Sequence, residues 1–203
     1  MVGMPSARTP YPEAARELLR QTLFGAARDQ LEQRPWSEIT MSDIAAAAGV
    51  SRQTLYKEFG NRNEFGLAFV IHEGERFLDD VEAAVLEHVD DPRAAVTAAL
   101  ELFLRTAGED PLIRILLRDD GRGGMLPFVT TQGVPVVQWA TLRLAGVIEE
   151  GWPQAPKGDV SLLSESLVRL AISYITTPSE SAETTAASVA ELLGPFIDRA
   201  LGS

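Results

Sequence analysis

The stretch Thr40–Arg62, which reads TMSDIAAAAGVSRQTLYKEFGNR, decides the fold of the chain. Its pattern predicts two short helices joined by a tight turn. Thr40 can cap the start of the first helix, and Asp43 then lies near the positive end of the helix dipole. Gly49 stands where this helix must end and the chain must turn, a position that often needs a positive φ. Ser51 can cap the second helix.

The second of these helices has one apolar and one polar face. Leu55 and Phe59 lie four residues apart and share the inward side. The other side chains suit double-stranded DNA, because Gln and Thr can contact base edges while Arg, Lys and Tyr can bind phosphates. A helix-turn-helix explains this pattern, but so does an αα-hairpin whose polar face is merely solvated. The outward set is Arg52, Gln53, Thr54, Tyr56 and Lys57.

The same segment resembles the DNA-binding domain of the TetR family of transcriptional repressors, and this resemblance favours the helix-turn-helix. The family pattern is roughly T-v-x-x-I-A-x-x-A-G-V-S-x-x-T-L-Y-x-x-F-x-x-K, and the resemblance covers roughly residues 1–70. Arg62 departs from the usual Lys but keeps its positive charge. The matching residues are Thr40, Ile44, Ala45, Ala48, Gly49, Val50, Ser51, Thr54, Leu55, Tyr56 and Phe59.

The resemblance implies a way of binding DNA. The Ser51–Phe59 helix would enter the major groove of a double-stranded operator, with Gln53 and Thr54 against the bases. The residues expected to contact phosphates are Thr40, Arg52, Tyr56, Lys57 and Arg62, and Ser51 at the start of the helix completes the expected DNA-binding set.

Charge is distributed unevenly along the chain. The whole sequence of 203 residues carries a net charge of −11. Residues 1–70 hold eight Lys and Arg against eight Asp and Glu, and residues 71–203 hold ten against twenty-one, so all the acidity lies beyond the helix-turn-helix. An acidic body that faces away from the duplex is compatible with DNA binding.

The composition also bounds the cellular setting. The chain has no Cys, which excludes disulfides and thiol chemistry and is consistent with a reducing cytosol. We expect no signal peptide, and no apolar run approaches the ~18 residues that a membrane span needs. The sequence therefore predicts a soluble, cytoplasmic protein that does not enter a membrane.

Hydrophobic periodicity predicts an all-α fold of about nine helices. A flexible arm, residues 1–10, precedes the first helix, and segment 119–131 is an irregular connection. We place a DNA-binding domain at residues 1–62 and a ligand-binding and dimerisation domain at residues 63–203. Outside the central stretch, the predicted helices are Pro12–Arg34, Asn61–Val89, Pro92–Ala107, Asp110–Arg118, Gln132–Glu150, Asp159–Thr177 and Ser181–Leu201.

The last two predicted helices carry more apolar side chains than an exposed pair of helices would hold. The family resemblance implies that the equivalent helices of two subunits form a four-helix dimer interface. A homodimer also suits DNA recognition, because two-fold symmetry places two reading helices about 34–36 Å apart on a palindromic site. The predicted interface residues are Leu163, Leu167, Leu170, Tyr174, Val189, Leu192, Leu193 and Phe196.

A second apolar set lies on the predicted helices four to seven. Taken alone, such a set is typical of a packed core without a cavity. The resemblance favours a pocket, because TetR-type repressors generally hold an inducer there. Arg105, Arg114, Arg118 and Arg143 are candidates to bind a carboxylate at its mouth. The predicted pocket residues are Phe77, Phe103, Ile113, Leu116, Leu117, Phe128, Val137 and Leu142.

Segments along the whole chain resemble one actinobacterial branch of the family, whose regulators are linked to alkane oxidation and lipid handling. These segments are SRQTLYKEFGNR, ERFLDDVEAAV, DPLIRILL, LPFVTTQG, VRLAISYITTPS and LLGPFIDRALG. The resemblance implies a long-chain apolar or fatty-acid-like effector that releases a repressor from its operator. The alternatives are a regulator with a filled core and no small-molecule inducer, and an activator controlled by a protein partner.

Enzymatic activity is not expected. The chain has no Cys and no G-x-S-x-G motif, and His72 and His88 are isolated from any metal-ligand pattern. Segment 119–131 follows no predicted strand and lacks Gly-Lys-Ser/Thr, so its glycines do not predict a phosphate-binding loop. We therefore expect no cofactor and no metal. A helical interaction protein with a vestigial helix-turn-helix is the other alternative.

Overall fold

The computed structural model describes residues 11–117 and 123–202, and within these ranges the chain forms helices and their connections but no strand. The predicted all-α fold is confirmed. The chain divides into two compact units, Met1–Phe65 and Gly66–Ser203. The predicted arm, residues 1–10, lies outside the described residues. Of the helices in the described ranges, none has the length and apolar character needed to span a membrane.

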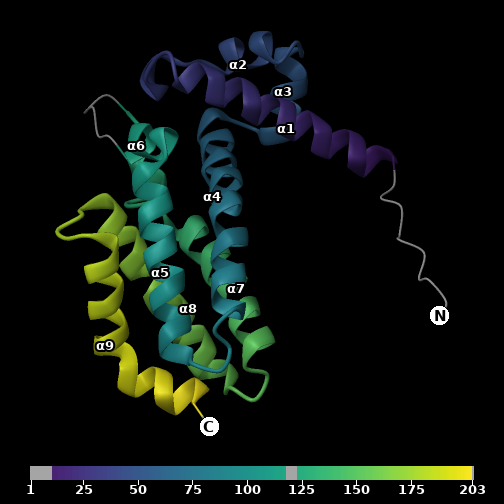
Figure 1. The fold of residues 1–203 in the computed structure, drawn as a ribbon. Helices are drawn as coiled ribbons and strands as arrows, with labels where there is room; N and C mark the ends of the chain where they lie inside the picture. The colour runs from purple at the N-terminus through teal and green to yellow at the C-terminus, as the bar shows by residue number, and fades with distance from the viewer. Residues whose placement is uncertain (1–10, 118–122, 203) are drawn as a thin grey trace. The chain divides into compact units, whose positions relative to one another are not determined.

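The N-terminal unit contains α1, a short 3-10 helix, the α2–α3 pair and the first turn of α4 (Figure 1). Helix α2 contacts both α1 and α3. Helix α1 ends earlier than predicted, since the chain turns before Pro35 and the residue preceding a proline disfavours helix. The bounds are α1 Tyr11–Leu31, η1 Trp36–Glu38, α2 Met41–Ala47, α3 Arg52–Phe59 and α4 Arg62–Leu86.

Side-chain caps begin α2 and α3, as the sequence predicts. The Thr40 hydroxyl accepts a hydrogen bond from the Asp43 amide (3.2 Å), and the Asp43 carboxylate accepts one from the Thr40 amide (2.8 Å). These bonds from Thr40, its backbone amide first, lower the pKa of Asp43 below its usual value. The Ser51 hydroxyl accepts from the Thr54 amide at 3.0 Å. Gly49 takes a φ of +68°, which allows the tight turn between the helices.

An aromatic cluster forms the core of the N-terminal unit. Phe65 is fully buried at its centre. Its ring meets Phe59 edge-on at a centroid distance of 4.9 Å and stacks on Trp36 at 6.3 Å. Phe24 of α1 adds a third contact at 5.7 Å. The cluster therefore fixes α3 against α1 and the start of α4.

The C-terminal unit is a bundle in which α5 lies against α9 and α7 against α8 (Figure 1). The Asp91 carboxylate caps α5 by accepting from the amides of Arg93 and Ala94, each at 3.1 Å. The Arg93 guanidinium then pairs with Asp198 of α9, its Nε lying 2.7 Å from Oδ1. The bounds in this unit are α5 Pro92–Glu109, α6 Pro111–Leu117, η2 Leu126–Phe128, α7 Val134–Gly151, α8 Lys157–Thr176 and α9 Ala182–Leu201.

The aromatic cluster generates a stability prediction. Replacing Phe65 by Ala removes a fully buried ring and should lower the free energy of unfolding of the N-terminal unit by about 3–5 kcal/mol. Hydrogen exchange of the α1 and α3 amides measures this unit specifically. Tyr11→Ala is the control, because Tyr11 is 85% exposed and its loss should change stability by less than about 0.5 kcal/mol. Equal exchange rates in both variants would contradict the prediction.

Candidate functional site

Helix α3 presents a polar face to solvent. Leu55 and Phe59 are buried, whereas Arg52, Gln53 and Lys57 are exposed. Tyr56 is 47% exposed. The division between inward and outward residues is the one that the sequence predicts.

Two hydroxyl groups at the start of α3 are paired with each other. The Ser51 and Thr54 side-chain oxygens lie 2.8 Å apart, and one of them donates to the other. Ser51 therefore acts first as a helix cap. Thr54 is half-buried and its hydroxyl still has acceptor capacity for a further donor.

The acidic residue of α3 is turned away from this polar face by contacts that sequence reasoning missed. Glu58 accepts hydrogen bonds from Arg16 and Arg20 of α1, each at 2.9 Å. The Arg20 guanidinium also lies over the Phe59 ring, 4.7 Å from its centroid. These pairs neutralise Glu58, so that the exposed charges of α3 itself are the positive ones of Arg52 and Lys57. The only sequence signal was the four-residue spacing of the two arginines.

Arg62 has a structural role that differs from the predicted phosphate contact. Its Nε donates to the carbonyl of Ile39 at 3.2 Å, and a terminal nitrogen donates to the carbonyl of Trp36. The guanidinium carbon lies 4.4 Å from the centroid of the Trp36 ring. Burial lowers the pKa of Arg62. The side chain ties the start of α4 to the η1 segment and is not part of the polar face of α3.

The C-terminal unit contains an apolar cavity of about 170 Å³, given as the space open to the centre of a water-sized sphere. Helices α4, α5, α6, α7 and α8 supply most of its lining. No charged, hydroxyl or amide side chain occurs among the described lining residues. Their heteroatoms are the indole nitrogens of Trp139 and Trp152 and the sulfur of Met125. Such a cavity stays dry and suits hydrocarbon, as an engineered ~150 Å³ cavity in another protein binds benzene.

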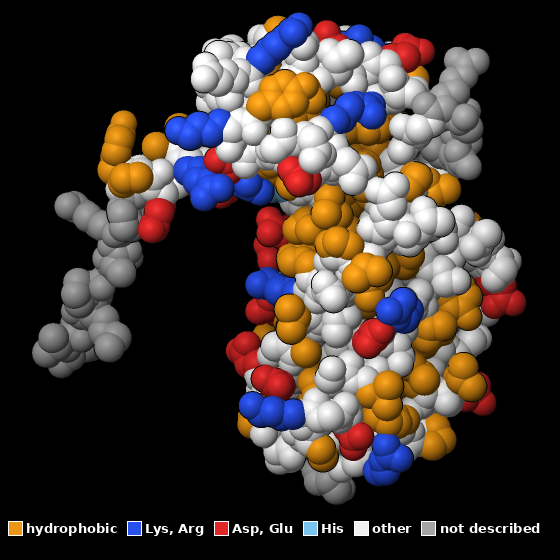
Figure 2. All heavy atoms as spheres, turned by 180° about the vertical axis from the view of Figure 1, so that it is seen from behind, with side chains coloured by type: hydrophobic (Ala, Val, Ile, Leu, Met, Phe, Trp, Pro, Cys, Tyr) orange, Lys and Arg blue, Asp and Glu red, His pale blue; other side chains and the backbone are white. Residues whose placement is uncertain are grey.

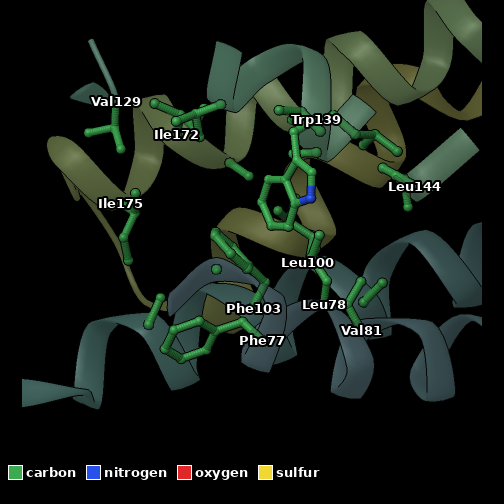
Figure 3. A pocket seen from close by; sticks show the side chains of 18 of the residues that line it. Phe77, Leu78, Val81, Leu100, Phe103, Val129, Trp139, Leu144, Ile172 and Ile175 are labelled. Carbon is green, nitrogen blue, oxygen red and sulfur yellow. The ribbon is translucent and has the colours of Figure 1, made fainter. Parts of the chain in front are cut away.

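Trp139 reaches across the cavity from α7 (Figure 3). Its ring approaches α4 at Gly74, where an added Cβ would lie only 3.0 Å from two ring atoms. On α4 and α5, Phe77 and Phe103 face the same space, with their rings edge-to-face at a centroid distance of 6.5 Å. The aromatic rings therefore line the space without filling it.

The predicted pocket residues divide into two groups. Phe77, Phe103, Ile113, Leu116 and Leu117 line the cavity.

The prediction was wrong for Phe128, Val137 and Leu142, which are not among the residues lining this cavity. Leu142 is 74% exposed, because it lies on the outer side of α7. Val137 instead packs with Ala140 and Val168, and Phe128 is buried in η2. Sequence reasoning took the wrong side of α7 for Leu142, whereas Val137 lies on the side of the lining residues without reaching the space. The lining residues of α7 follow a 3.6-residue period: Val136, Trp139, Ala140, Leu144 and Ile148.

The predicted dimer residues also divide by burial. The prediction of a dimer interface was wrong for Leu163, Leu167 and Val189, because they are buried in the core of their own unit and present no surface to a second copy, and Leu167 lines the cavity. Leu192 is 73% exposed, and Leu162 of α8, which was not predicted, is 56% exposed. The remaining predicted interface residues are partly exposed: Leu170, Tyr174, Leu193 and Phe196. Figure 2 shows hydrophobic side chains in patches on the surface of the C-terminal unit.

Of the four candidate arginines, two are engaged elsewhere. Arg143 pairs with Asp79 at 2.9 Å and with Glu82 at 2.6 Å. Arg105 lies 3.3 Å from Glu101. Arg118 lies outside the described residues, as do Asp119 and Asp120. The described residues contain no group of three His, Cys, Asp or Glu side chains that could hold a metal.

Comparison with known proteins identifies the family. The model described as bacterial regulatory proteins, tetR family, matches residues 23–68, which contain α2 and α3. The model described as bacterial Tetracyclin repressor, C-terminal domain, matches residues 91–195. The HTH-type transcriptional regulator AlkX of Mycobacterium tuberculosis is 37% identical over 195 residues, which are 96% of this chain and 92% of that protein. The chain belongs to the TetR family. It is thus a DNA-binding transcriptional regulator and not an enzyme.

Solved structures agree with this assignment. The TetR family repressor AlkX from Dietzia sp., described as implicated in biodegradation of n-alkanes, superposes with a TM-score of 0.76 at 34% identity, covering 90% of this chain and 96% of that one. A TetR-family regulator from Pectobacterium atrosepticum superposes with a TM-score of 0.61 at 21% identity, covering 97% and 99% of the two chains, and shows the shared fold.

Proposed function

We propose that this TetR-family protein is a repressor that binds a palindromic operator as a homodimer and is released when a long-chain apolar effector enters the cavity. The observation that carries the proposal is an unfilled cavity lined by apolar side chains in the same chain as a helix-turn-helix. In this proposal the protein acts in the cytoplasm, where its operator DNA lies.

In this proposal the exposed face of α3 contacts the operator. Gln53 and Thr54 read base edges, and Arg52, Tyr56 and Lys57 bind phosphates. Thr40 contacts a phosphate from the start of α2, and Ser51 positions the helix as its cap. Arg62 stabilises the N-terminal unit through its own contacts and does not bind a DNA phosphate. The exposure of these α3 side chains and the removal of Glu58 to α1 support this division of roles.

The dimer in this proposal forms through the outer side of α8 and α9. Leu162 and Leu192 are exposed large apolar residues on these helices, with partly exposed Tyr174 and Phe196 also on them. Burying such side chains against a second copy removes apolar surface from water, which is favourable by roughly 25 cal/mol per Å². Two-fold symmetry would then present two α3 helices to a palindrome.

The effector acts through the cavity. The AlkX repressor of Dietzia sp. is described as implicated in biodegradation of n-alkanes, and the apolar lining here suits a long hydrocarbon chain. Occupancy favours a conformation in which the two DNA-reading helices have the wrong spacing. A coupling of about 1–3 kcal/mol lowers operator affinity about 5–150-fold.

The α3 assignment predicts a charge-specific loss of DNA binding. Lys57→Ala should weaken binding to an operator fragment selected from a random duplex pool, and the slope of log affinity against log salt should fall in magnitude by about 1. Lys157→Ala is the matched control, because Lys157 is exposed at the start of α8. Fluorescence anisotropy at several salt concentrations measures both. An unchanged salt slope in Lys57→Ala would exclude a phosphate contact.

The proposed dimer interface predicts that a charge placed in it changes the oligomeric state. Leu192→Glu places a charge in the apolar contact and should give monomers that bind the operator poorly in analytical ultracentrifugation and anisotropy. Leu142→Glu should stay dimeric, because Leu142 is 74% exposed on α7, comparable to the 73% of Leu192, but lies on another helix. If Leu192→Glu remains dimeric and Leu142→Glu does not, the interface lies on α7 instead.

The cavity assignment predicts the loss of effector response on filling. Ala99 lines the cavity, so Ala99→Leu should raise the free energy of unfolding by about 0.5–2 kcal/mol while abolishing release from the operator by dodecan-1-ol. Ala83→Leu is the control, since Ala83 is exposed on α4. Anisotropy titrations of the operator complex and urea unfolding measure the two effects. A wild-type response in Ala99→Leu would remove the cavity from the mechanism.

A further inference from the structure

The two flanks of α3 carry different side chains. At 3.6 residues per turn, Arg52 and Tyr56 lie on one flank of the helix and Glu58 lies on the opposite one. The exposed Gln53 and Lys57 face outward between these flanks. A helix with its side chains is about 10–12 Å wide and the major groove is about 12 Å wide. Both flanks of a helix in the groove therefore come close to a phosphate backbone.

The flank that carries Glu58 is acidic in sequence but has a positive charge in the folded unit. The Glu58 side chain is only 10% exposed, because α1 lies beside α3 and covers it (Figure 1). Arg16 of α1 donates from its Nε to both carboxylate oxygens at 2.9 Å, and Arg20 donates to one of them at 2.9 Å. Two guanidinium groups and one carboxylate leave this cluster with a net charge of +1. The flank therefore attracts a phosphate instead of repelling it.

The two arginines of the cluster differ in what their guanidinium groups can still bind. Arg20 packs over aromatic rings, 4.7 Å from the centroid of Phe59 and 5.4 Å from that of Phe24. Arg16 is 65% exposed, and its bonds to Glu58 use the Nε alone. Its two terminal nitrogens have no hydrogen bond or ion pair with any residue in the described part of the chain. Arg16 is therefore the member of the cluster with free donors.

The chemistry of these free donors suits a phosphate. A guanidinium presents its N–H groups in a planar fork, which matches two oxygens of a phosphate or a carboxylate. Because Glu58 already holds the Nε of Arg16, the side chain loses less conformational freedom when it binds. A guanidinium held at the edge of α3 with its fork exposed is thus prepared to bind a phosphate beside that helix.

We propose that Arg16 is a further DNA-contact residue, whose terminal nitrogens bind a phosphate of the backbone along the Glu58 flank of α3. Glu58 is a positioning residue, which holds the Arg16 guanidinium beside the helix and does not touch DNA itself. Arg16 precedes residues 23–68, which match the TetR-family model, so the contact comes from outside the matched segment. The inference rests on the proposed function, because it requires α3 to lie in the major groove.

Fluorescence anisotropy of the full-length protein at several salt concentrations tests the inference. The probes are an operator fragment selected from a random duplex pool and a random duplex of the same length. Arg16→Gln should lower the slope of log affinity against log salt by about 0.9 for each Arg16 that contacts a phosphate. At 0.15 M salt it should weaken binding to both probes by about 3–10-fold, since phosphate contacts carry no sequence information. An unchanged slope overturns the inference, because a purely structural role of Arg16 leaves the number of phosphate contacts the same.

Two further variants control for charge and for folding. Arg105→Gln removes the same charge from a side chain that is 53% exposed and paired with Glu101 on α5, so it should keep the wild-type slope. Arg16→Lys should keep most of the slope, since it keeps the positive charge. If circular dichroism shows that Arg16→Gln lowers the helical content, Arg16→Lys decides. A slope near that of the wild type then supports the contact, and a slope as low as that of Arg16→Gln overturns it.

The positioning role of Glu58 is tested by combining substitutions at both sites. In the wild type, Glu58→Gln removes a negative charge near DNA but also loosens Arg16, and these two effects on affinity oppose each other. In the Arg16→Gln background only the first effect remains. Glu58→Gln should therefore change operator affinity at least about threefold more favourably in that background than in the wild type. Equal effects in both backgrounds overturn the positioning role.

Lys57→Ala separates the failure of this inference from the failure of the proposed function. If Lys57→Ala lowers the salt slope and Arg16→Gln does not, the Arg16 contact is overturned while the assignment of α3 to DNA stands. If neither substitution changes the slope, the assignment of α3 to the major groove fails, and the Arg16 contact fails with it. A lower slope in both variants supports both.

Discussion

The unfilled apolar cavity of the C-terminal unit is the constraint on which the proposed regulation depends. At about 24 cal/mol per Å³, a cavity of about 170 Å³ costs about 4 kcal/mol relative to a filled core. That is a large part of the 5–15 kcal/mol by which a typical domain is stable. Five lining positions are Ala residues, where a larger side chain would occupy the space: Ala95, Ala99, Ala107, Ala140 and Ala171. A ligand that fills the space restores the missing contacts and so stabilises the conformation that holds it.

The N-terminal unit, unlike the C-terminal one, has a closely packed core. Phe65 is fully buried among aromatic rings, and Arg62 is held by two backbone carbonyls and the face of Trp36. These contacts hold α3 by packing, while Glu58 is drawn back onto α1 by Arg16 and Arg20. The polar face of α3 is therefore held in place by a closely packed core beneath it. A recognition helix requires such support, because base contacts depend on accurate placement of short side chains.

Local signals explain how much of this could be predicted from the sequence. Each helix of the helix-turn-helix begins with a capping hydrogen bond between residues three apart in the sequence. The same spacing caps α4, where the Glu64 amide donates to the Asn61 side chain at 3.0 Å and the Asn61 amide donates to the Glu64 carboxylate at 3.2 Å. Gly49 could be placed because few other residues adopt a positive φ. The all-α fold followed from periodicity, and the family from a contiguous motif.

The wrong predictions concern which residues of a helix face the cavity, the core or solvent. Long-range packing between helices decides this orientation. Helix α7 is apolar around much of its circumference, so its pattern did not distinguish Leu142, on the outside, from Leu144, which lines the cavity. In α8 the predicted dimer residue Leu167 faces the cavity, because α7 packs along α8. Arg62 was assigned to phosphate because its charge was visible in the sequence, whereas the Trp36 ring beneath it was not.

Native mass spectrometry of the full-length protein as purified from cells tests the central claim most directly. The account predicts a dimer in which each subunit carries an added mass that disappears on denaturation, and in which addition of operator DNA displaces that mass. A dimer that binds operator with no added mass before or after incubation with long-chain alcohols and acids would contradict effector control through the cavity.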